Sequence, residues 1–359
     1  MEWADCVTPF GDSAASRDCL IAGQVSLQRE SVLGRNDGGD CVPLSLFDDL
    51  EPSYPPAWGK PLDSLLAQCP EYDWGSSRFP IIFCSSNFGV GNLVALRRNK
   101  AAEHQALGTP QRSVDWIADR FKWGPARQII SHACVSAQLG LNLAHQWVQS
   151  SDVERVLVMS FDFLSPFVAG GFNALKILNG EMPQPFTNRE IGSIGLGEGV
   201  AAAVIGRDEG DWVMTNPVTF NEMEHMTANA SDGAGFSSLL SQFDSEIPSD
   251  RIWIKGHGTG TLDAGRLEAE SIQKFFPDSP LISWKGSLGH TLGSCALVEL
   301  AIALRAMESG TIPGTVGAGQ SLMTDTVADE PFSSQSKDGF ISLSNAFGGA
   351  HAGCLIHHA

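Results

Sequence analysis

Two distant segments of the 359-residue chain repeat one order of features. Each begins with an apolar run typical of a buried strand, continues with a loop of small residues that carries one reactive side chain, and ends in an apolar helix. The reactive side chain is Cys134 in the first segment and His290 in the second. A chain that repeats this unit is constrained to an α/β fold, and we predict two similar halves with one site between them.

Other apolar runs agree with this class. Buried strands are predicted at residues 80–84, 127–131, 155–159, 201–205, 251–255, 281–284 and 340–343. Helical spacing predicts helices at 135–148, 267–276 and 294–307, and the last is apolar on most faces and therefore buried. The first 80 residues are rich in Gly, Pro, Asp and Ser and have weak periodicity, so we expect irregular structure there.

The charge balance excludes several classes of partner. Asp and Glu total 41 against 23 Lys and Arg, a formal net charge of −18. A field of that sign repels nucleic acid and anionic membranes, so we expect neither as a partner. The eight cysteines are scattered without a C-x-x-C pair, which indicates thiols and not disulfides. No apolar stretch could span a membrane and no signal peptide is recognisable, so we expect a soluble, cytoplasmic protein.

Cys134 differs from the other cysteines because it lies at a predicted strand-to-helix junction. Backbone N–H groups at a helix N-terminus stabilise a thiolate, so we expect a lowered pKa and a nucleophilic thiol. The same N–H groups can hold an oxyanion. The alternative from position alone is a small buried cysteine with a packing role.

Two histidines, His257 and His290, follow predicted strands and are flanked by glycines. Glycine lets the backbone approach a ligand closely, so both imidazoles are candidate catalytic groups; the alternative is a pair of core histidines. With Cys134 they could form a zinc site, but no carboxylate or second cysteine lies at ligand spacing, and we expect no metal. The glycine run at 195–199 precedes a predicted strand, the reverse of a nucleotide-binding loop.

Short motifs accompany these residues along most of the chain. They read Thr8-Pro9-Phe10-Gly11, His132-Ala133-Cys134-Val135-Ser136-Ala137, Gly170-Gly171-Phe172-Asn173-Ala174-Leu175, Gly197-Glu198-Gly199, His225-Met226-Thr227, Gly256-His257-Gly258-Thr259-Gly260-Thr261, Gly289-His290-Thr291 and Asn345-Ala346-Phe347-Gly348-Gly349. In this order and spacing they resemble the β-ketoacyl-ACP synthases, the elongating ketosynthases of the thiolase superfamily. The resemblance implies a five-layered αβαβα thiolase fold with two pseudo-repeated halves. Residues 1–208 would carry the nucleophile and residues 209–359 the two histidines.

The resemblance also implies a decarboxylative Claisen condensation. Cys134 would hold an acyl chain as a thioester, and His257 and His290 would donate N–H groups to the enolate left when malonyl-carrier-protein loses carbon dioxide. The backbone N–H groups of Cys134 and Phe347 would form a second oxyanion hole. Acyl groups would arrive on the phosphopantetheine of an acyl carrier protein, so we expect no other cofactor.

Two charged residues complete the implied site. Lys285 would orient His257 and Glu268, and Glu268 would hold the lysine in place. The acidic residue that relatives have three positions before Glu268 is Gly265 in this chain.

The implied acyl pocket departs from the family pattern at one position. Phe172, Asn345 and Gly348 are its candidate lining and gating residues. Relatives typically have Phe-Gly-Phe-Gly-Gly in the C-terminal loop, and the first aromatic is Asn345 here. We therefore expect a different gate and a different chain preference.

A basic segment upstream of Cys134 is a candidate docking site for an acidic carrier protein. Residues 97–127 carry seven Lys or Arg against three acidic residues, a local excess of four positive charges. The alternative is a solvated helix face. The candidate docking residues are Arg97, Arg98, Lys100, Arg120, Lys122 and Arg127.

Three functions remain open from the sequence. The first is an active ketosynthase of fatty-acid, polyketide or polyene synthesis, working as a homodimer or with a second ketosynthase-like subunit. The second is a chain-length-factor-like partner subunit; such subunits usually lack the nucleophile, which is present here. The third is a thiolase-like acyltransferase, which would use a second cysteine near the C-terminus, and Cys354 is the candidate.

Overall fold

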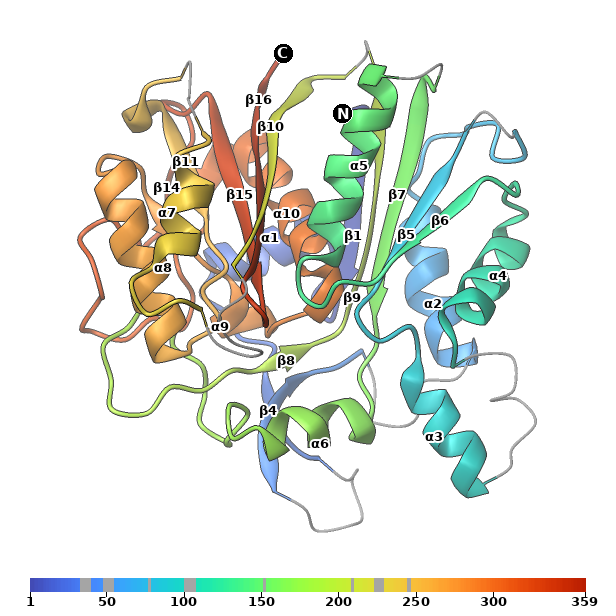
Figure 1. The fold of residues 1–359 in the computed structure, drawn as a ribbon, viewed down its shortest axis with the longest axis horizontal. Coiled ribbons are helices and arrows are strands. Elements are labelled where there is room, and N and C mark those ends of the chain that lie inside the picture. Colours follow the sequence, from blue (N-terminus) through green and yellow to red (C-terminus); the bar gives the residue numbers. More distant parts are fainter. Residues whose placement is uncertain are drawn as a thin grey trace.

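The computed structural model describes residues 1–32, 40–47, 55–76, 79–99, 108–150, 153–207, 210–222, 229–243 and 247–359. Two mixed sheets form the frame, with strand orders β2-β1-β9-β7-β5-β6 and β10-β16-β15-β11-β12 (Figure 1). The first sheet contains β1 (Trp3–Thr8), β2 (Gly11–Asp12), β5 (Ile81–Cys84), β6 (Arg127–Ile130), β7 (Arg155–Asp162) and β9 (Gly199–Gly206). The second contains β10 (Trp212–Asn221), β11 (Ile252–Lys255), β12 (Leu281–Ile282), β15 (Gly339–Ala346) and β16 (Ala350–His358).

The two sheets repeat one pairing pattern. From β1 in the first sheet, and from β10 in the second, two antiparallel pairings are followed by two parallel ones. The last strand of each series, β6 or β12, leads to a reactive residue and then to a central helix. These helices are α5 (Ser136–Ser150) and α10 (Cys295–Ser309). The duplication predicted from the Cys134 and His290 segments is therefore present in the topology.

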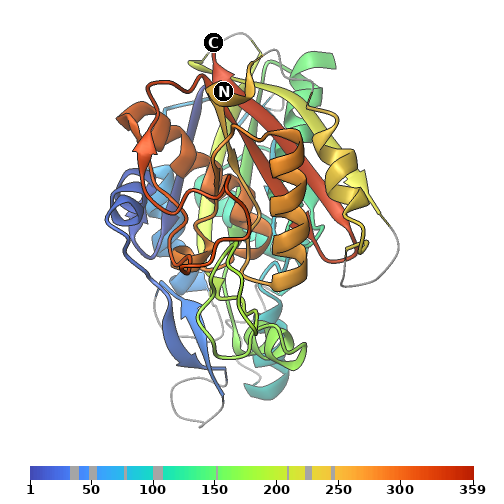
Figure 2. The same cartoon turned by 90° about the vertical axis from the view of Figure 1, so that its left-hand side faces the viewer.

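Helices form three layers around the two sheets. α5 and α10 lie between the sheets and share one apolar core with residues of both, with α1 (Ser13–Ile21) beside them (Figure 1). α2 (Pro55–Leu66) and α4 (Pro110–Phe121) cover the outer face of the first sheet. α7 (Ala234–Leu240) and α8 (Leu262–Phe275) cover the outer face of the second, which is turned toward the viewer in Figure 2. The expected five-layered αβαβα fold is confirmed.

Smaller elements gather at the end of the sheets where the reactive residues lie. A three-stranded sheet is formed by β3 (Gln28–Ser31), β4 (Cys41–Ser45) and β8 (Leu196–Gly197), and α6 (Pro166–Ala174) packs against it. The elements of the chain not yet named, wherever they lie, are α3 (Val90–Asn99), η2 (Ser249–Arg251), α9 (Lys285–Leu288), η3 (Leu292–Ser294), β13 (Thr311–Ile312) and β14 (Phe332–Ser333). In the described part of the chain, no helix is both long and apolar enough to cross a membrane.

The expectation of irregular structure over the first 80 residues was wrong. This region contains β1, α1, β3, β4 and α2. Pro61 lies inside α2 and Gly59 precedes it, so the local sequence of this helix resembles a loop. Trp58 and Leu62 of the same helix are buried in the core on the outer face of the first sheet. Tertiary packing therefore outweighs the local preference of these residues.

Candidate active site

The turn that carries Cys134 connects β6 to α5 and is held by local hydrogen bonds. The Ser136 hydroxyl donates to the Ala133 carbonyl oxygen at 2.7 Å and accepts from the His132 N–H at 2.8 Å. Ala133 has φ of +47°, a left-handed conformation that costs energy for a residue with a side chain. Strain of this kind persists only where the surroundings fix it, and here it directs the Cys134 side chain into the interior, with 7% of the residue exposed.

The glycines that flank His257 are required by packing. Gly258 has φ of +24°, and a Cβ atom there would lie 2.6 Å from the ring of Phe186. The Glu268 carboxylate, on α8, accepts the N–H of His257 at 2.5 Å and the N–H of Gly258 at 2.9 Å. The position of the imidazole thus depends on a carboxylate that binds the two consecutive backbone N–H groups of His257 and Gly258.

His290 is held in place by the glycine run at residues 195–199. From the sequence, this run was considered only as a nucleotide-binding loop and was excluded as one. The His290 N–H donates to the Gly195 carbonyl oxygen at 2.7 Å, and the Gly197 N–H donates to the His290 carbonyl oxygen at 3.0 Å. A Cβ atom at Gly197 would lie 2.2 Å from the Leu288 carbonyl oxygen. The glycines therefore permit a close backbone contact that holds His290 in place.

These turns bring the three candidate groups together. The sulfur of Cys134, one ring nitrogen of His257 and one ring nitrogen of His290 all lie within 4.8 Å of one another. The two imidazole rings are perpendicular, with centroids 5.0 Å apart. Both ring nitrogens of His290, and Nδ1 of His257, are buried without a partner among the described residues. Polar atoms buried in this way are available to a ligand.

The electrostatics keep both imidazoles neutral. Burial lowers the pKa of His257 and of His290 well below the usual histidine value, and the nearby Lys285 ammonium lowers both further. A neutral imidazole retains one N–H donor that can stabilise negative charge on an oxygen. The two neighbouring lysines, Lys255 and Lys285, oppose a divalent cation at the same place, so the group suits an anion better than a metal.

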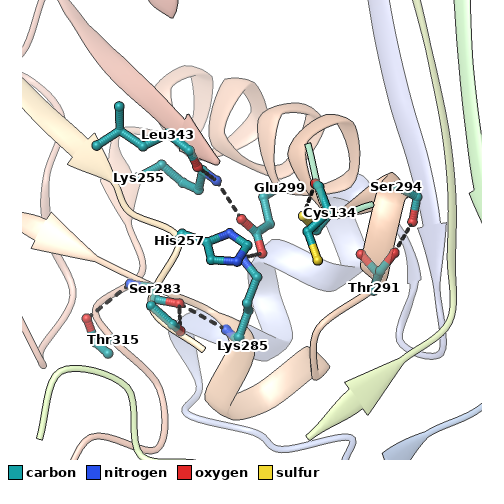
Figure 3. Close-up of polar contacts among 12 residues, drawn as sticks. Cys134, Lys255, His257, Ser283, Lys285, Thr291, Ser294, Glu299, Thr315 and Leu343 are labelled. Carbon is teal, nitrogen blue, oxygen red and sulfur yellow. Dashed lines mark hydrogen bonds and ion pairs between the residues drawn. The ribbon is translucent and has the colours of Figure 1, made fainter. Parts of the chain in front are cut away.

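The partner of Lys285 differs from the expected one. Glu268 was expected to hold this lysine, but its oxygens bind backbone N–H groups. The lysine instead donates to the Glu299 carboxylate at 2.6 Å, and both side chains are buried (Figure 3). Burial alone would lower the pKa of Lys285, but the charge of Glu299 raises it. Glu299 was not predicted, although an acidic residue in the middle of the apolar stretch of α10 was a signal for a buried ion pair.

The expectation of a lowered pKa at Cys134 was wrong for the resting site. Burial raises the pKa of this thiol, and the charge of Lys285 only partly opposes the shift. Cys295, the first residue of α10, donates its S–H to the Cys134 carbonyl oxygen at 3.4 Å. Burial therefore favours the neutral form of the Cys134 thiol in this structure.

A cavity of about 850 Å³ opens at the three groups. Of the predicted pocket residues, Phe172 and Asn345 line it, as does Phe347, which was predicted as an oxyanion donor; Gly348 is not part of the lining. Phe172 and Phe347 face each other with ring centroids 6.1 Å apart. Gly348 instead forms the turn between β15 and β16, where its φ of +84° requires a glycine.

Asn345 stands in a polar network. Its amide exchanges hydrogen bonds with the amide of Asn229 at 3.2 and 3.3 Å. Asn229 also donates to the Glu222 carboxylate at 3.1 Å, and His351 lies 3.1 Å from the same oxygen. This side of the cavity is therefore lined by hydrogen-bonded amides.

The predicted docking residues lie away from the cavity as far as the structure describes them. Arg120 is paired with Asp63, and Arg127 is paired with Asp115 at 2.9 Å. Lys122 ends α4 in a left-handed conformation. Lys100 and the side chains of Arg97 and Arg98 lie outside the described residues, as do His225, Met226 and Thr227. The described cations that line the cavity are Lys176 and Arg266, both exposed.

Solved ketosynthase structures share the fold described above. Among solved structures, the fold matches a ketosynthase, ApeO, in complex with its chain length factor, ApeC, from Xenorhabdus doucetiae. That match has a TM-score of 0.81 and 19% identity, and covers 100% of this chain and 97% of the other. A type II polyketide synthase acyl carrier protein in complex with its ketosynthase gives a TM-score of 0.78 and 18% identity, with 99% and 98% covered.

Sequence comparison finds a family match over part of the chain. The family described as "Beta-ketoacyl synthase, C-terminal domain" matches residues 215–318. A highly reducing polyketide synthase of Didymella fabae is 26% identical over 72% of this chain and 15% of its own length. The tetracenomycin polyketide synthase ketoacyl synthase alpha subunit of Streptomyces glaucescens is 25% identical over 68% of this chain and 62% of its own. Residues 215–318 therefore resemble the C-terminal domain of β-ketoacyl synthases, and the chain is similar to polyketide synthases, of whose own lengths it spans less than two thirds.

Proposed function

We propose that this protein catalyses decarboxylative Claisen condensation in polyketide assembly. The observation that carries the proposal is the convergence of Cys134, His257 and His290 within 4.8 Å at the end of a cavity. A thiol supplies the covalent acyl carrier, and two neutral imidazoles supply the N–H donors that an enolate oxygen needs. Each of the three groups has a distinct part in such a reaction.

The reaction proceeds in two half-reactions. The Cys134 sulfur attacks the thioester of an acyl carrier protein, forms acyl-Cys134 and releases the carrier thiol with the displaced proton. Malonyl-carrier-protein then loses carbon dioxide, and His257 and His290 donate to the resulting enolate oxygen. The enolate carbon attacks the acyl-Cys134 carbonyl, whose oxygen we assign to the backbone N–H groups of Cys134 and Phe347. Breaking the C–S bond then releases the β-ketoacyl-carrier product, and the Cys134 sulfur regains a proton.

The carrier protein is part of the proposal. The cavity opens to the surface beside Lys176 and Arg266, which can attract the phosphate of a phosphopantetheine arm or an acidic carrier surface. We further propose that the protein works as a dimer, either with itself or with a second ketosynthase-like subunit. One of the solved structures it resembles is a complex of a ketosynthase with a chain length factor.

Two alternatives receive less support. A non-catalytic partner subunit would not need the nucleophile, both imidazoles and the buried Lys285. A thiolase-like enzyme would need Cys354 in the site, but this thiol lies in β16, in the core between the sheets, and accepts from the Gln138 side chain at 3.2 Å. We therefore propose decarboxylative condensation over both alternatives.

Intact-protein mass spectrometry after incubation with a panel of acyl-carrier thioesters tests the proposal. We expect an acyl adduct on the wild type and on Cys354→Ala, and none on Cys134→Ala. His257→Ala and His290→Ala should still acquire some adduct but lose release of carbon dioxide from malonyl-carrier-protein. An adduct that persists in Cys134→Ala would show that the nucleophile is assigned wrongly.

A further inference from the structure

One buried cation has no role in the reaction just described. Lys255 is the last residue of β11, two positions before His257, and is fully buried. Its ammonium group donates to the Glu299 carboxylate at 2.7 Å and to the Leu343 carbonyl oxygen at 2.7 Å (Figure 3). A buried lysine is rare because its charge must be removed from water, so a specific set of partners such as this one calls for an explanation.

Lys255 and Lys285 share one carboxylate. Glu299 receives Lys255 on one oxygen at 2.7 Å and Lys285 on the other at 2.6 Å. The two lysine side chains are 0% exposed and the glutamate side chain 4%. The group therefore holds two positive charges and one negative charge away from water, and the carboxylate cannot turn without breaking one of its two ion pairs.

The net positive charge of the Lys255–Glu299–Lys285 group acts on Cys134, His257 and His290. Lys285 opposes the burial effect on the Cys134 thiol and favours the neutral form of both histidines. Lys255 acts in the same direction on His257 and His290. The titratable groups on which Lys255 or Lys285 acts, from every element packed against them, are Cys134, His257, Glu268, His290, Cys295, Glu299 and Cys354.

Without Lys255, Glu299 would change its relation to Lys285. One carboxylate oxygen would lose its donor, and the carboxylate would be free to take Lys285 on both oxygens. The group would then be neutral overall, and the field of the Lys285 ammonium at Cys134 would be more fully cancelled.

We propose that Lys255 is a positioning residue of the active site, which fixes Glu299 and thereby sets the position and the uncancelled charge of Lys285. The role of Lys255 in condensation rests on the proposed function. Its effect on Cys134 does not, because the thiol can be probed without any substrate.

A double-mutant cycle on Cys134 reactivity tests the proposal. The rate of Cys134 alkylation by iodoacetamide at fixed pH is followed by peptide mass spectrometry in the wild type, Lys255→Met, Lys285→Met and the double variant. We expect Lys255→Met to slow alkylation by about 3- to 10-fold, and the double variant to be no slower than Lys285→Met alone, because Lys255 acts through Lys285. Lys337→Met, a change at a lysine that binds the Asp250 carbonyl oxygen far from the site, should leave the rate unchanged.

A second variant separates position from folding. Lys255→Gln keeps an N–H donor for Glu299 and Leu343 but removes the charge, and should fall between the wild type and Lys255→Met. Circular dichroism confirms that each variant is folded before alkylation. A wild-type alkylation rate in folded Lys255→Met or Lys255→Gln, or slowing factors that multiply in the double variant, would overturn the proposal.

Condensation assays on the same variants separate this inference from the proposed function. We expect kcat to fall in Lys255→Met while KM for malonyl-carrier-protein stays within about twofold, because no contact with the carrier is removed. Wild-type protein that forms no acyl adduct but shows the alkylation pattern above would reject the condensing function and still support the role of Lys255.

Discussion

Glu268 offers a direct test of how the active-site turn is held. It is 2% exposed and accepts the backbone N–H groups of His257 and Gly258 on its two oxygens. In Glu268→Gln one oxygen is replaced by an NH2 group, which cannot accept, so one of these N–H groups loses its partner. Losing a hydrogen bond to a charged group and leaving a donor buried costs about 2–4 kcal/mol, after relief of the buried charge offsets part of the loss.

For a chain of this size, such a loss corresponds to a Tm lowered by about 3–5 °C. Because the turn that carries His257 loosens, decarboxylation of malonyl-carrier-protein should fall at least about tenfold. Thermal melts by circular dichroism and release of labelled carbon dioxide measure the two effects. Glu270→Gln, at an exposed position of the same helix, is the matched control for the melt. A Glu268→Gln protein that melts within about 1 °C of this control and decarboxylates at the wild-type rate would refute the reasoning.

Two further predictions follow from the same site. Burial and Lys285 lower the pKa of His257 and His290, and the proposed function requires the neutral rings. Decarboxylation should therefore persist as the pH falls through the usual histidine range and be lost only below it. A pH–rate profile that falls with a midpoint near about 6.5 would contradict this prediction. Gly258→Ala should lower the free energy of unfolding by at least about 2 kcal/mol, because its Cβ would meet the ring of Phe186. The control Gly170→Ala lies on α6 with open space around its Cβ and should be neutral or stabilising. Equal urea midpoints for the two variants would count against the packing argument.

The sequence was most informative where a residue type is demanded by local geometry. Cys134, His257 and His290 could be selected because each follows an apolar strand and lies among small residues that only a tight turn requires. The strand at 251–255 was predicted nearly as found, since a strand buried on both faces is a continuous apolar run. The strand at 127–131 was also found, as β6, but it is partly exposed and not buried as predicted.

What could not be predicted depends on residues that meet only through tertiary packing. The Lys255–Glu299–Lys285 group joins strand β11 and helices α10 and α9, and nothing in local spacing says which carboxylate a lysine will reach. Helix α2 was missed because Pro61 interrupts its pattern while its stability comes from contacts with the sheet. The docking residues stay a prediction: they were selected by net charge along the chain, which does not show that Arg120 and Arg127 pair with acidic residues of α2 and α4.

The repeated topology has a consequence for how this site can change over time. The thiol stands before one central helix and an imidazole before its counterpart, and the contact between Cys295 and the Cys134 carbonyl oxygen joins the two starting points. Either half alone presents only some of these side chains, so the distance between the Cys134 thiol and the two imidazoles depends on how α5 and α10 pack against each other. Buried substitutions in α5 or α10 can therefore lower the rate of the proposed reaction without changing Cys134, His257 or His290.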